Sequence, residues 1–213
     1  FTLNRKRAVR IAKRIREEGL DISWSGSSRV DTFTDELARA MKKGGCHTIF
    51  FGIESGSQKT LDFIGKGITP EQSISAVNKA KKHKIRALGA FIIGFPEETR
   101  EDIEKTIKFS KKVGVDFAQF TIATPYPGTR LWKYALARKL ILTFNWRKYT
   151  TLDPVMKLKN FTAQQITKLF HKAYISFYLR PLYLIKDLIS RKGFIFMRAI
   201  PRVIRMARSV IGK

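Results

Sequence analysis

Cysteine and histidine are scarce in this sequence. Its 213 residues contain one cysteine, Cys46, and three histidines. A single thiol excludes a disulfide framework, a cysteine-rich zinc site and any iron–sulfur cluster held by cysteines of this chain alone. The histidines lack the spacing of a metal site. We therefore expect no metal ligand in this chain, and we interpret Cys46 as a small buried residue.

Acidic residues and long apolar runs are also lacking. There are 17 Asp and Glu against 42 Lys and Arg, which gives a formal net charge of +25. No apolar run reaches the ~18–20 residues of a transmembrane helix, and no apolar signal core follows the basic residues near the start. The hydrophobic content of 44% is enough for a packed core. We expect a cytoplasmic protein and interpret the chain, which begins at Phe1, as a piece of a longer one.

Positive charge is concentrated toward the C-terminus. Residues 157–213 contain 13 Lys and Arg but one acid, Asp187, for a net charge of +12. Residues 1–156 carry a net charge of +13 over a much longer segment. This shift in composition predicts a core domain at residues 1–153 and a basic, aromatic, helical tail at residues 154–213.

Helical and strand patterns alternate along the first 150 residues. The expected helices span residues 3–18, 34–43, 69–83 and 99–112, and the expected strands span residues 22–24, 48–53, 87–94 and 117–123. This alternation is typical of parallel β/α units, so the predicted fold class is α/β. The continuous apolar run at residues 48–53 predicts a strand buried on both faces. Because parallel strands end at one edge, where such folds bind ligands, the residues just past each strand form the candidate site.

Charged residues follow the first two expected strands. Glu54 ends the second, where a carboxylate can accept two hydroxyl hydrogen bonds, as from a ribose. The alternative is that residues 55–57, Ser-Gly-Ser, form only a turn. Arg29 follows the first strand, and its side chain is either a solvated charge or an anion clamp for a carboxylate. The residues alone leave these alternatives open.

Glycine and proline mark the ends of the next two strands. Gly94 interrupts an apolar run, which would let a flat ligand approach the backbone, and residues 95–97 continue as Phe-Pro-Glu. The acidic residues that come next also suit the positive N-terminus of the following helix. Residues 124–129, Thr-Pro-Tyr-Pro-Gly-Thr, either hold Tyr126 rigidly over the strand ends or serve only as a turn, with Thr129 capping the next helix.

Four segments with these residues occur in a recognisable order. They are Phe51–Gln58, Lys66–Thr69, Gly89–Thr99 and Pro125–Thr129. Together they resemble the radical SAM superfamily and, within it, the class with a cobalamin-binding domain; the similarity covers about residues 1–150. The resemblance implies a partial (β/α) barrel that holds a 4Fe–4S cluster and S-adenosylmethionine (SAM). Reductive cleavage of SAM in this family yields a 5′-deoxyadenosyl radical that abstracts hydrogen from the substrate.

The resemblance also implies which residues bind SAM. They are Glu54, Ser55, Ala90, Ile92, Gly94, Glu97, Tyr126 and Arg29. Glu54 takes the place of the polar residue at the ribose hydroxyls. The segment from Ala90 to Glu97 lies beside the adenine, with Ala90 replacing one family glycine and Glu97 standing where this class usually has another. Tyr126 belongs to the turn that closes the SAM pocket, and Arg29 is similar to an arginine that faces the site.

The family's cluster loop, Cys-x-x-x-Cys-x-x-Cys, does not occur in this sequence. The segment that begins at Phe1 resembles the part of the family's barrel that comes after the second strand, so we expect two strands, the cluster loop and any cobalamin domain to lie outside this chain. The chain alone is then expected not to cleave SAM. The resemblance implies a cobalamin-dependent methyltransferase or ring-modifying enzyme, with a small-molecule or lipid-like substrate and a reductant such as ferredoxin or flavodoxin.

Two other functions remain open. A tRNA methylthiotransferase would suit the positive charge. The comparable strand of that group reads Pro-Val-Gln-Ser-Gly-Ser, however, whereas residues 52–57 here read Gly-Ile-Glu-Ser-Gly-Ser. The alternative of a different class is a non-catalytic basic module that binds nucleic acid or an anionic membrane, although charge alone predicts only non-specific affinity.

Two helical patterns occur in the tail. Residues 162–165, Thr-Ala-Gln-Gln, form a capping box for a helix that should end before Pro181. Residues 194–213 are amphipathic, with four arginines on one side and apolar residues on the other. This segment either packs on the protein or contacts an anionic membrane surface, and nucleic-acid binding is a third alternative.

Overall fold

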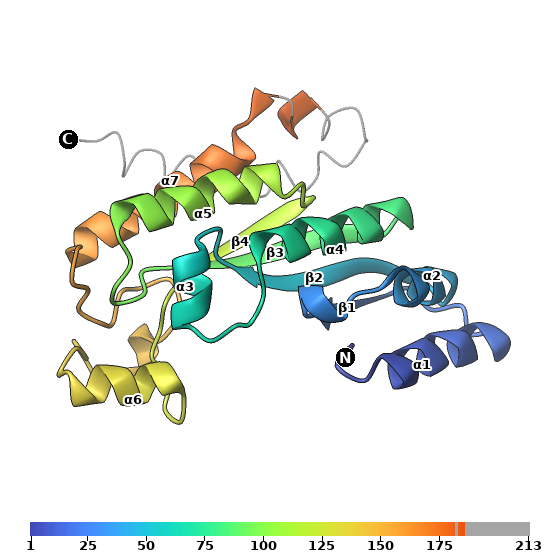
Figure 1. The fold of residues 1–213 in the computed structure, drawn as a ribbon, viewed down its shortest axis with the longest axis horizontal. Helices are drawn as coiled ribbons and strands as arrows, with labels where there is room; N and C mark the ends of the chain where they lie inside the picture. Colours follow the sequence, from blue (N-terminus) through green and yellow to red (C-terminus); the bar gives the residue numbers. More distant parts are fainter. Residues whose placement is uncertain (182, 186–213) are drawn as a thin grey trace. The chain divides into compact units, whose positions relative to one another are not determined.

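The computed structural model describes residues 1–181 and 183–185 (Figure 1). The helices are α1 (Arg5–Glu17), α2 (Asp35–Lys43), α3 (Gln58–Phe63), α4 (Pro70–Lys82), α5 (Arg100–Lys112), α6 (Arg130–Ala137) and α7 (Ala163–Tyr178). The strands are β1 (Trp24–Ser28), β2 (Cys46–Glu54), β3 (Arg86–Ile93) and β4 (Phe117–Ile122). Two 3₁₀ helices, η1 (Val30–Thr32) and η2 (Trp146–Lys148), lie between them in the chain. The helices expected in the first 150 residues are therefore present, and so are the expected strands, although the first strand lies at Trp24–Ser28 and not at residues 22–24.

The strands form one sheet in the order β1-β2-β3-β4, in which β1 pairs with β2 and β2 with β3 in parallel. Helices and strands alternate along the chain, which confirms the α/β class. The main difference from expectation is β1. Residues 25–28, expected as a turn after a strand at 22–24, are extended because they pair with residues 48–51 of β2.

The described chain divides into two compact units. The first unit consists of Phe1–Phe91 and Lys108–Gln119, and the second consists of Ile92–Ile107 and the chain from Phe120 onward. The divisions fall inside β3, α5 and β4. A separate domain beginning at residue 154 stays a prediction, since α7 belongs to the same compact unit as Ile92–Ile107.

Local capping explains where the helices begin. Thr69 and Thr162 each form a capping box, with Gln72 and Gln165 respectively. Thr129 accepts a hydrogen bond from the Trp132 N–H and so begins α6, as expected. α7 ends before Pro181, which confirms that prediction. The amphipathic segment expected at residues 194–213 lies outside the described residues.

The two faces of the sheet differ in burial. Phe50 of β2 pairs with Leu88 of β3, and Phe50 is 38% exposed. The next pair, Phe51 and Gly89, is buried. Successive side chains of a strand point to opposite faces, and along β3 buried and half-buried residues alternate. The prediction that residues 48–53 are buried on both faces is therefore wrong, because the face that carries Phe50 is not fully covered.

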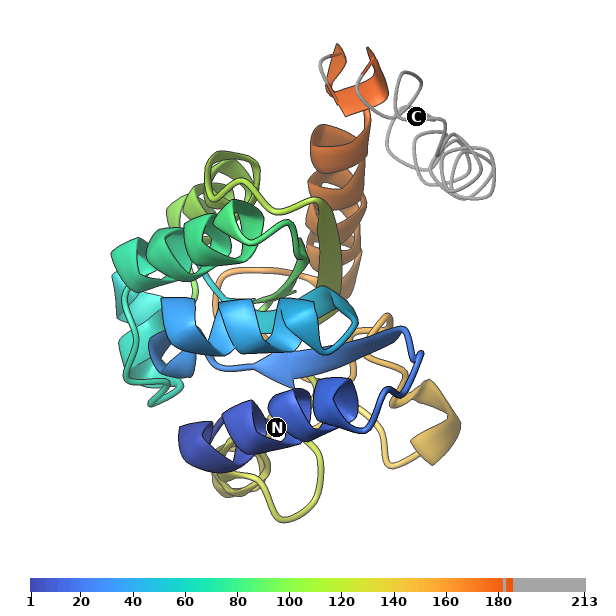
Figure 2. The same cartoon turned by 90° about the vertical axis from the view of Figure 1, so that its right-hand side faces the viewer.

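In the first unit α1 and α2 run alongside each other (Figure 2). Each buries a stripe of small or apolar residues at helical spacing, which in α1 is Ala8, Val9 and Ala12. The basic side chains of α1 are on its exposed side. In the described part of the chain, no helix has the length and apolar character needed to cross a membrane.

Candidate functional site

Glu54, the last residue of β2, carries a nearly buried carboxylate. Its side chain is 14% exposed, and Oε1 accepts a hydrogen bond from Nζ of Lys66 at 2.6 Å. The backbone of Glu54 has a φ of +67°, in the left-handed region, and the pairing of β2 with β3 is irregular between Gly52 and Glu54. This bulge turns the end of the strand and fixes where the carboxylate lies.

Gly52 makes room for that ion pair. A Cβ atom on Gly52 would lie 2.7 Å from Glu54 Oε1 and 3.1 Å from Lys66 Nζ, so any larger residue would displace one of these groups. Gly52 also pairs with Ala90 of β3, which is half-buried. The structure therefore brings two sequence-predicted site residues, Glu54 and Ala90, into the same part of the first unit.

The second oxygen of Glu54, Oε2, has no hydrogen-bond partner among residues 1–181 and 183–185. A buried carboxylate oxygen is normally paired, because leaving it unpaired costs free energy. A nearly buried acceptor that the protein leaves unpaired fits a ligand with hydroxyl groups.

Arg29 is neither a solvated charge nor a free anion clamp. Its guanidinium donates to both carboxylate oxygens of Asp31, at 3.0 and 2.8 Å, and to the backbone carbonyl of Lys66 at 2.8 Å. The hydrogen bond from Arg29 lowers the pKa of Asp31, and the same bond raises the pKa of Arg29. Arg29 thus restrains the backbone of Lys66, and the side chain of Lys66 in turn pairs with Glu54.

Ser55 is fully buried and shapes the turn after β2. Its Oγ accepts a hydrogen bond from the Ser57 N–H at 3.1 Å. Its own N–H donates to the carbonyl of Ile53 at 2.9 Å. This is the turn chemistry that the sequence left open, and it places Glu54 at the start of the turn.

A second buried carboxylate, Glu98, organises the turn after β3 in the second unit. Glu98 is 3% exposed, and its Oε2 accepts the N–H groups of Gly94 at 2.6 Å and Phe95 at 2.9 Å. The sequence suggested only a helix N-terminus for the acids in this segment. The four-residue spacing from Gly94 to Glu98 is the signal that could have revealed the turn.

Gly94 has a packing reason in the structure. Its φ of +84° is a conformation that favours glycine. A Cβ atom there would lie 3.0 Å from Cγ1 of Ile166 in α7, so that side of Gly94 is covered. The sequence suggested open space for a flat ligand at Gly94, but on this side the structure shows Ile166 instead. Ile92, two residues earlier, is half-buried.

Glu97 and Tyr126 are both exposed residues of the second unit. Glu97 accepts a hydrogen bond from the Tyr134 hydroxyl at 2.9 Å and lies 3.4 Å from Nζ of Lys159. The bond from Tyr134 lowers the pKa of Glu97, while partial burial raises the pKa of Tyr134. Tyr126 donates its hydroxyl to the backbone carbonyl of Tyr149 at 2.7 Å, which fixes the ring at the predicted turn.

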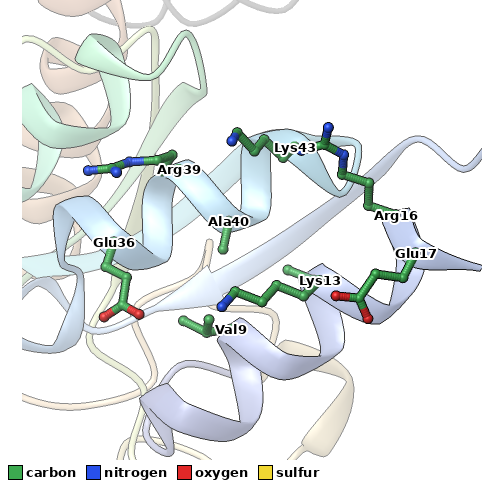
Figure 3. A pocket seen from close by; sticks show the side chains of 9 residues that line it. Val9, Lys13, Arg16, Glu17, Glu36, Arg39, Ala40 and Lys43 are labelled. Atoms are coloured by element: carbon green, nitrogen blue, oxygen red, sulfur yellow. The ribbon is translucent and has the colours of Figure 1, made fainter.

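A groove of about 570 Å³ lies between α1 and α2 in the first unit (Figure 3). Its lining side chains are Val9, Ala12, Lys13, Arg16, Glu17, Glu36, Arg39, Ala40 and Lys43. The floor is apolar and the rim carries four basic and two acidic groups. The groove contains no residue that the sequence assigned to the site, so it is separate from the surroundings of Glu54.

The 213 residues do not provide the ligands of a 4Fe–4S cluster. Cys46, the single cysteine, is buried, and burial raises the pKa of its thiol to about 11. A cluster needs several thiolates, and a buried thiol with a raised pKa is a poor ligand. Within the part that the structure describes, no group of three or more His, Cys, Asp or Glu residues could hold a metal ion.

A sequence profile of the radical SAM superfamily matches residues 1–110, which is more than half of the chain. The chain belongs to this superfamily, a class of enzymes that use SAM together with a 4Fe–4S cluster. The resemblance found in the sequence is thereby confirmed at the level of the family.

Known proteins define the relationship more closely. The chain is 67% identical over 206 residues to an uncharacterised methyltransferase of Pyrococcus horikoshii, which covers 97% of this chain and 45% of that relative. Coproporphyrinogen III oxidase of Escherichia coli, a radical SAM enzyme, matches with a TM-score of 0.59 at 16% identity, over 83% of this chain and 37% of that one. The radical SAM methyltransferase TsrM of Kitasatospora setae, solved with cobalamin and a 4Fe–4S cluster, gives 0.55 at 18% identity, over 61% and 25%. These likenesses confirm the barrel-type fold, and the chain spans less than half the length of each of these proteins.

Proposed function

We propose that this chain supplies part of the SAM-binding site of a radical SAM methyltransferase, with Glu54 as the acceptor of the ribose hydroxyls. The observation that carries the proposal is the carboxylate of Glu54: it is nearly buried, Lys66 pairs with Oε1, and Oε2 has no hydrogen-bond partner among the described residues. The left-handed backbone of Glu54 also supports it. Such a conformation costs about 1–3 kcal/mol and is concentrated at functional sites.

Three side chains of the first unit would act together. The ammonium group of Lys66 restrains the carboxylate through Oε1, so that Oε2 keeps a fixed direction. Arg29 restrains Lys66 through its backbone carbonyl. A ribose hydroxyl that donates to Oε2 would form a charge-assisted hydrogen bond, which is stronger than a bond between neutral groups.

We assign the remaining sequence-predicted residues to the same ligand. Ala90, Ile92, Gly94 and Glu97 would lie beside the adenine, and Tyr126 would close the pocket. Gly94 would contribute through the turn that its positive φ permits, because Ile166 covers its side-chain position. When bound, SAM supplies the sulfonium-linked adenosyl group on which the chemistry of this family depends.

The other components of the reaction would come from outside these 213 residues. They are the ligands of the 4Fe–4S cluster, a cobalamin-binding domain and a reductant such as ferredoxin or flavodoxin. The name of the Pyrococcus relative supports a methyl transfer, and TsrM, the methyltransferase of similar fold, was solved with cobalamin. The substrate would be a small or lipid-like molecule in the cytoplasm, and the chain alone would not cleave SAM.

The test is the affinity for SAM of the full-length protein that contains this sequence. Glu54→Ala should weaken binding by roughly 10–150-fold, since a charged hydrogen bond contributes about 1.5–3 kcal/mol. Isothermal titration calorimetry gives the affinity, and circular dichroism confirms the fold. Glu101→Ala, which removes a side chain that is 76% exposed, is the matched control and should leave the affinity unchanged. Unchanged affinity in a folded Glu54→Ala protein would disprove the assignment.

A further inference from the structure

Five aromatic side chains of the second unit form a connected cluster, which we name the aromatic surface: Tyr126, Trp132, Phe144, Trp146 and Tyr149, of which Tyr149 is buried. The ring centroids are 6.1 Å apart for Phe144 and Trp132, 5.9 Å for Trp132 and Trp146, 4.8 Å for Trp146 and Tyr149, and 6.1 Å for Tyr149 and Tyr126. Phe144 is 58% exposed and Trp146 is 55% exposed. Exposed apolar side chains that cluster, as Phe144 and Trp146 do, indicate an interaction surface.

Exposed apolar side chains also occur elsewhere in the segment that contributes the aromatic surface. Of the 14 large hydrophobic residues that are exposed in the described ranges, six lie between residues 126 and 152. They are Tyr126, Leu136, Leu142, Phe144, Trp146 and Leu152. The aromatic surface is therefore accompanied by exposed leucines.

The indole N–H groups of the aromatic surface are free to bind. In the part of the chain that the structure describes, neither Trp132 nor Trp146 donates a hydrogen bond through Nε1. Trp24 of the first unit differs, since its indole donates to the backbone carbonyl of Gly44. An amphipathic ring with a free donor is typical of tryptophan at a boundary between water and an apolar phase.

Within the segment that contributes the aromatic surface the charge has one sign, although Tyr134 of this segment donates a hydrogen bond to Glu97 outside it. Residues 124–152 contain no acid and six basic residues, Arg130, Lys133, Arg138, Lys139, Arg147 and Lys148. None of the six forms an ion pair with a described residue. Arg138 lies over the ring of Tyr134, at 3.9 Å from its centroid. Unpaired basic side chains beside exposed rings favour an anionic partner.

We propose that the aromatic surface and its basic neighbours bind the headgroup region of an anionic lipid bilayer. Tryptophan and tyrosine suit the interface, leucines enter the upper acyl region, and lysine and arginine bind anionic headgroups. A single-stranded nucleic acid would instead use flat faces of rings that are open for stacking. Here the rings pack against one another at tilted or edge-on angles of 36–80°, and the exposed leucines offer nothing to a base.

Fluorescence quenching of the 213-residue chain locates the contact. Vesicles of phosphatidylglycerol with brominated acyl chains quench indoles that enter the bilayer. Trp24→Phe keeps Trp132 and Trp146, and its emission should be quenched and shifted to the blue. The double variant Trp132→Phe, Trp146→Phe keeps Trp24 alone and should show neither change. Quenching of Trp24 equal to that of the other two would overturn the proposal.

Affinity for the vesicles tests the composition of the surface. Phe144→Ser with Trp146→Ser should reduce binding about tenfold or more, because the apolar area of two rings no longer enters the bilayer. Arg147→Glu with Lys148→Glu should reduce the affinity about fivefold for each basic residue replaced, and more at low salt. Leu20→Ser with Ile22→Ser is the matched control, since these first-unit side chains are 54% and 44% exposed. It should bind as the unchanged chain does.

Two further comparisons decide against the other partners. Removal of residues 194–213 should leave the dependence on Phe144 and Trp146 intact, and loss of that dependence would overturn the proposal. Binding of the same variants to single-stranded polyuridylate must stay unchanged; loss of that binding instead of vesicle binding would identify a nucleic-acid surface. Failure of the full-length protein to bind vesicles would show that another part of the protein covers the aromatic surface, and would also overturn the proposal. Because SAM affinity is not involved, these outcomes are independent of the role of Glu54.

Discussion

Glu54 in the first unit and Glu98 in the second are carboxylates at or just after the end of a strand, Glu54 nearly buried and Glu98 buried, yet their oxygens have different hydrogen-bond partners. One oxygen of Glu98 accepts two backbone N–H groups, at 2.6 and 2.9 Å. Glu54 has a single partner, Lys66, and its Oε2 has none among the described residues. Glu98 therefore accepts hydrogen bonds from the backbone of its own turn, whereas Glu54 has an acceptor oxygen that no described residue uses. The contrast shows that burial alone does not reveal whether both oxygens of a carboxylate find partners within the protein.

The largest expected effect on stability is at Glu98. Glu98→Ala leaves the buried N–H groups of Gly94 and Phe95 without their acceptor, which should lower the free energy of unfolding by about 2–4 kcal/mol. Urea unfolding of the 213-residue chain measures it, and Glu98→Gln, which keeps an acceptor, should lose less. Glu54→Ala should cost about 1 kcal/mol or less, because the long side chain of Lys66 can reach water. Equal losses at the two positions would contradict the comparison.

A smaller effect is expected from the partner of Glu54. Lys66→Met leaves the nearly buried carboxylate unpaired and should lower the free energy of unfolding by about 1–3 kcal/mol. The second unit offers the control, Lys159→Met, in which the ion pair to Glu97 is exposed on both sides. That substitution should give no measurable change in urea unfolding. A similar loss for both lysines would mean that the Lys66 pair is an ordinary surface pair.

The smallest effect concerns His171 in α7, where burial lowers the pKa below 6.5. The folded state then favours the neutral ring, so the unfolded chain binds more protons as the pH falls below about 6.5. Stability should be full above that pH and decrease below it. Thermal unfolding between pH 7.5 and 5.0 measures the slope, and His171→Gln should flatten it. An unchanged slope in the variant would show that another group titrates.

The order of helices and strands was predictable because periodicity and capping are local. Thr69 with Gln72 and Thr162 with Gln165 carry their capping boxes within four residues, and the structure contains both. The exposure of Phe50 was not predictable, since an apolar run does not reveal whether another layer covers the second face. The local sequence pattern therefore predicts the helices and strands, but it does not predict which faces of the strands other elements cover.

The candidate site was predictable only in part. Glu54 could be singled out because it ends an apolar strand. Lys66 lies 12 residues later and Arg29 acts on its backbone, so their roles depend on contacts that no local pattern encodes. Gly94 was singled out because it interrupts an apolar run, and the run does not reveal that Ile166, 72 residues later, covers it. The aromatic surface did leave a signal: an acid-free stretch of interleaved rings and basic residues between 124 and 152.

The turn after β3 has a consequence for the order in which the chain becomes structured. The side chain of Asn160 donates to the carbonyl of Glu98, and these residues are 62 positions apart. The Lys159 N–H reaches the carbonyl of Pro96, and Ile166 covers Gly94. On the ribosome, residues 94–98 emerge well before these partners are made, and such distant contacts form slowly because a long loop must close first. A nascent chain that stops short of residue 159 therefore carries every residue of the turn and the hydrogen bonds to Glu98, but not the distant contacts that cover the turn.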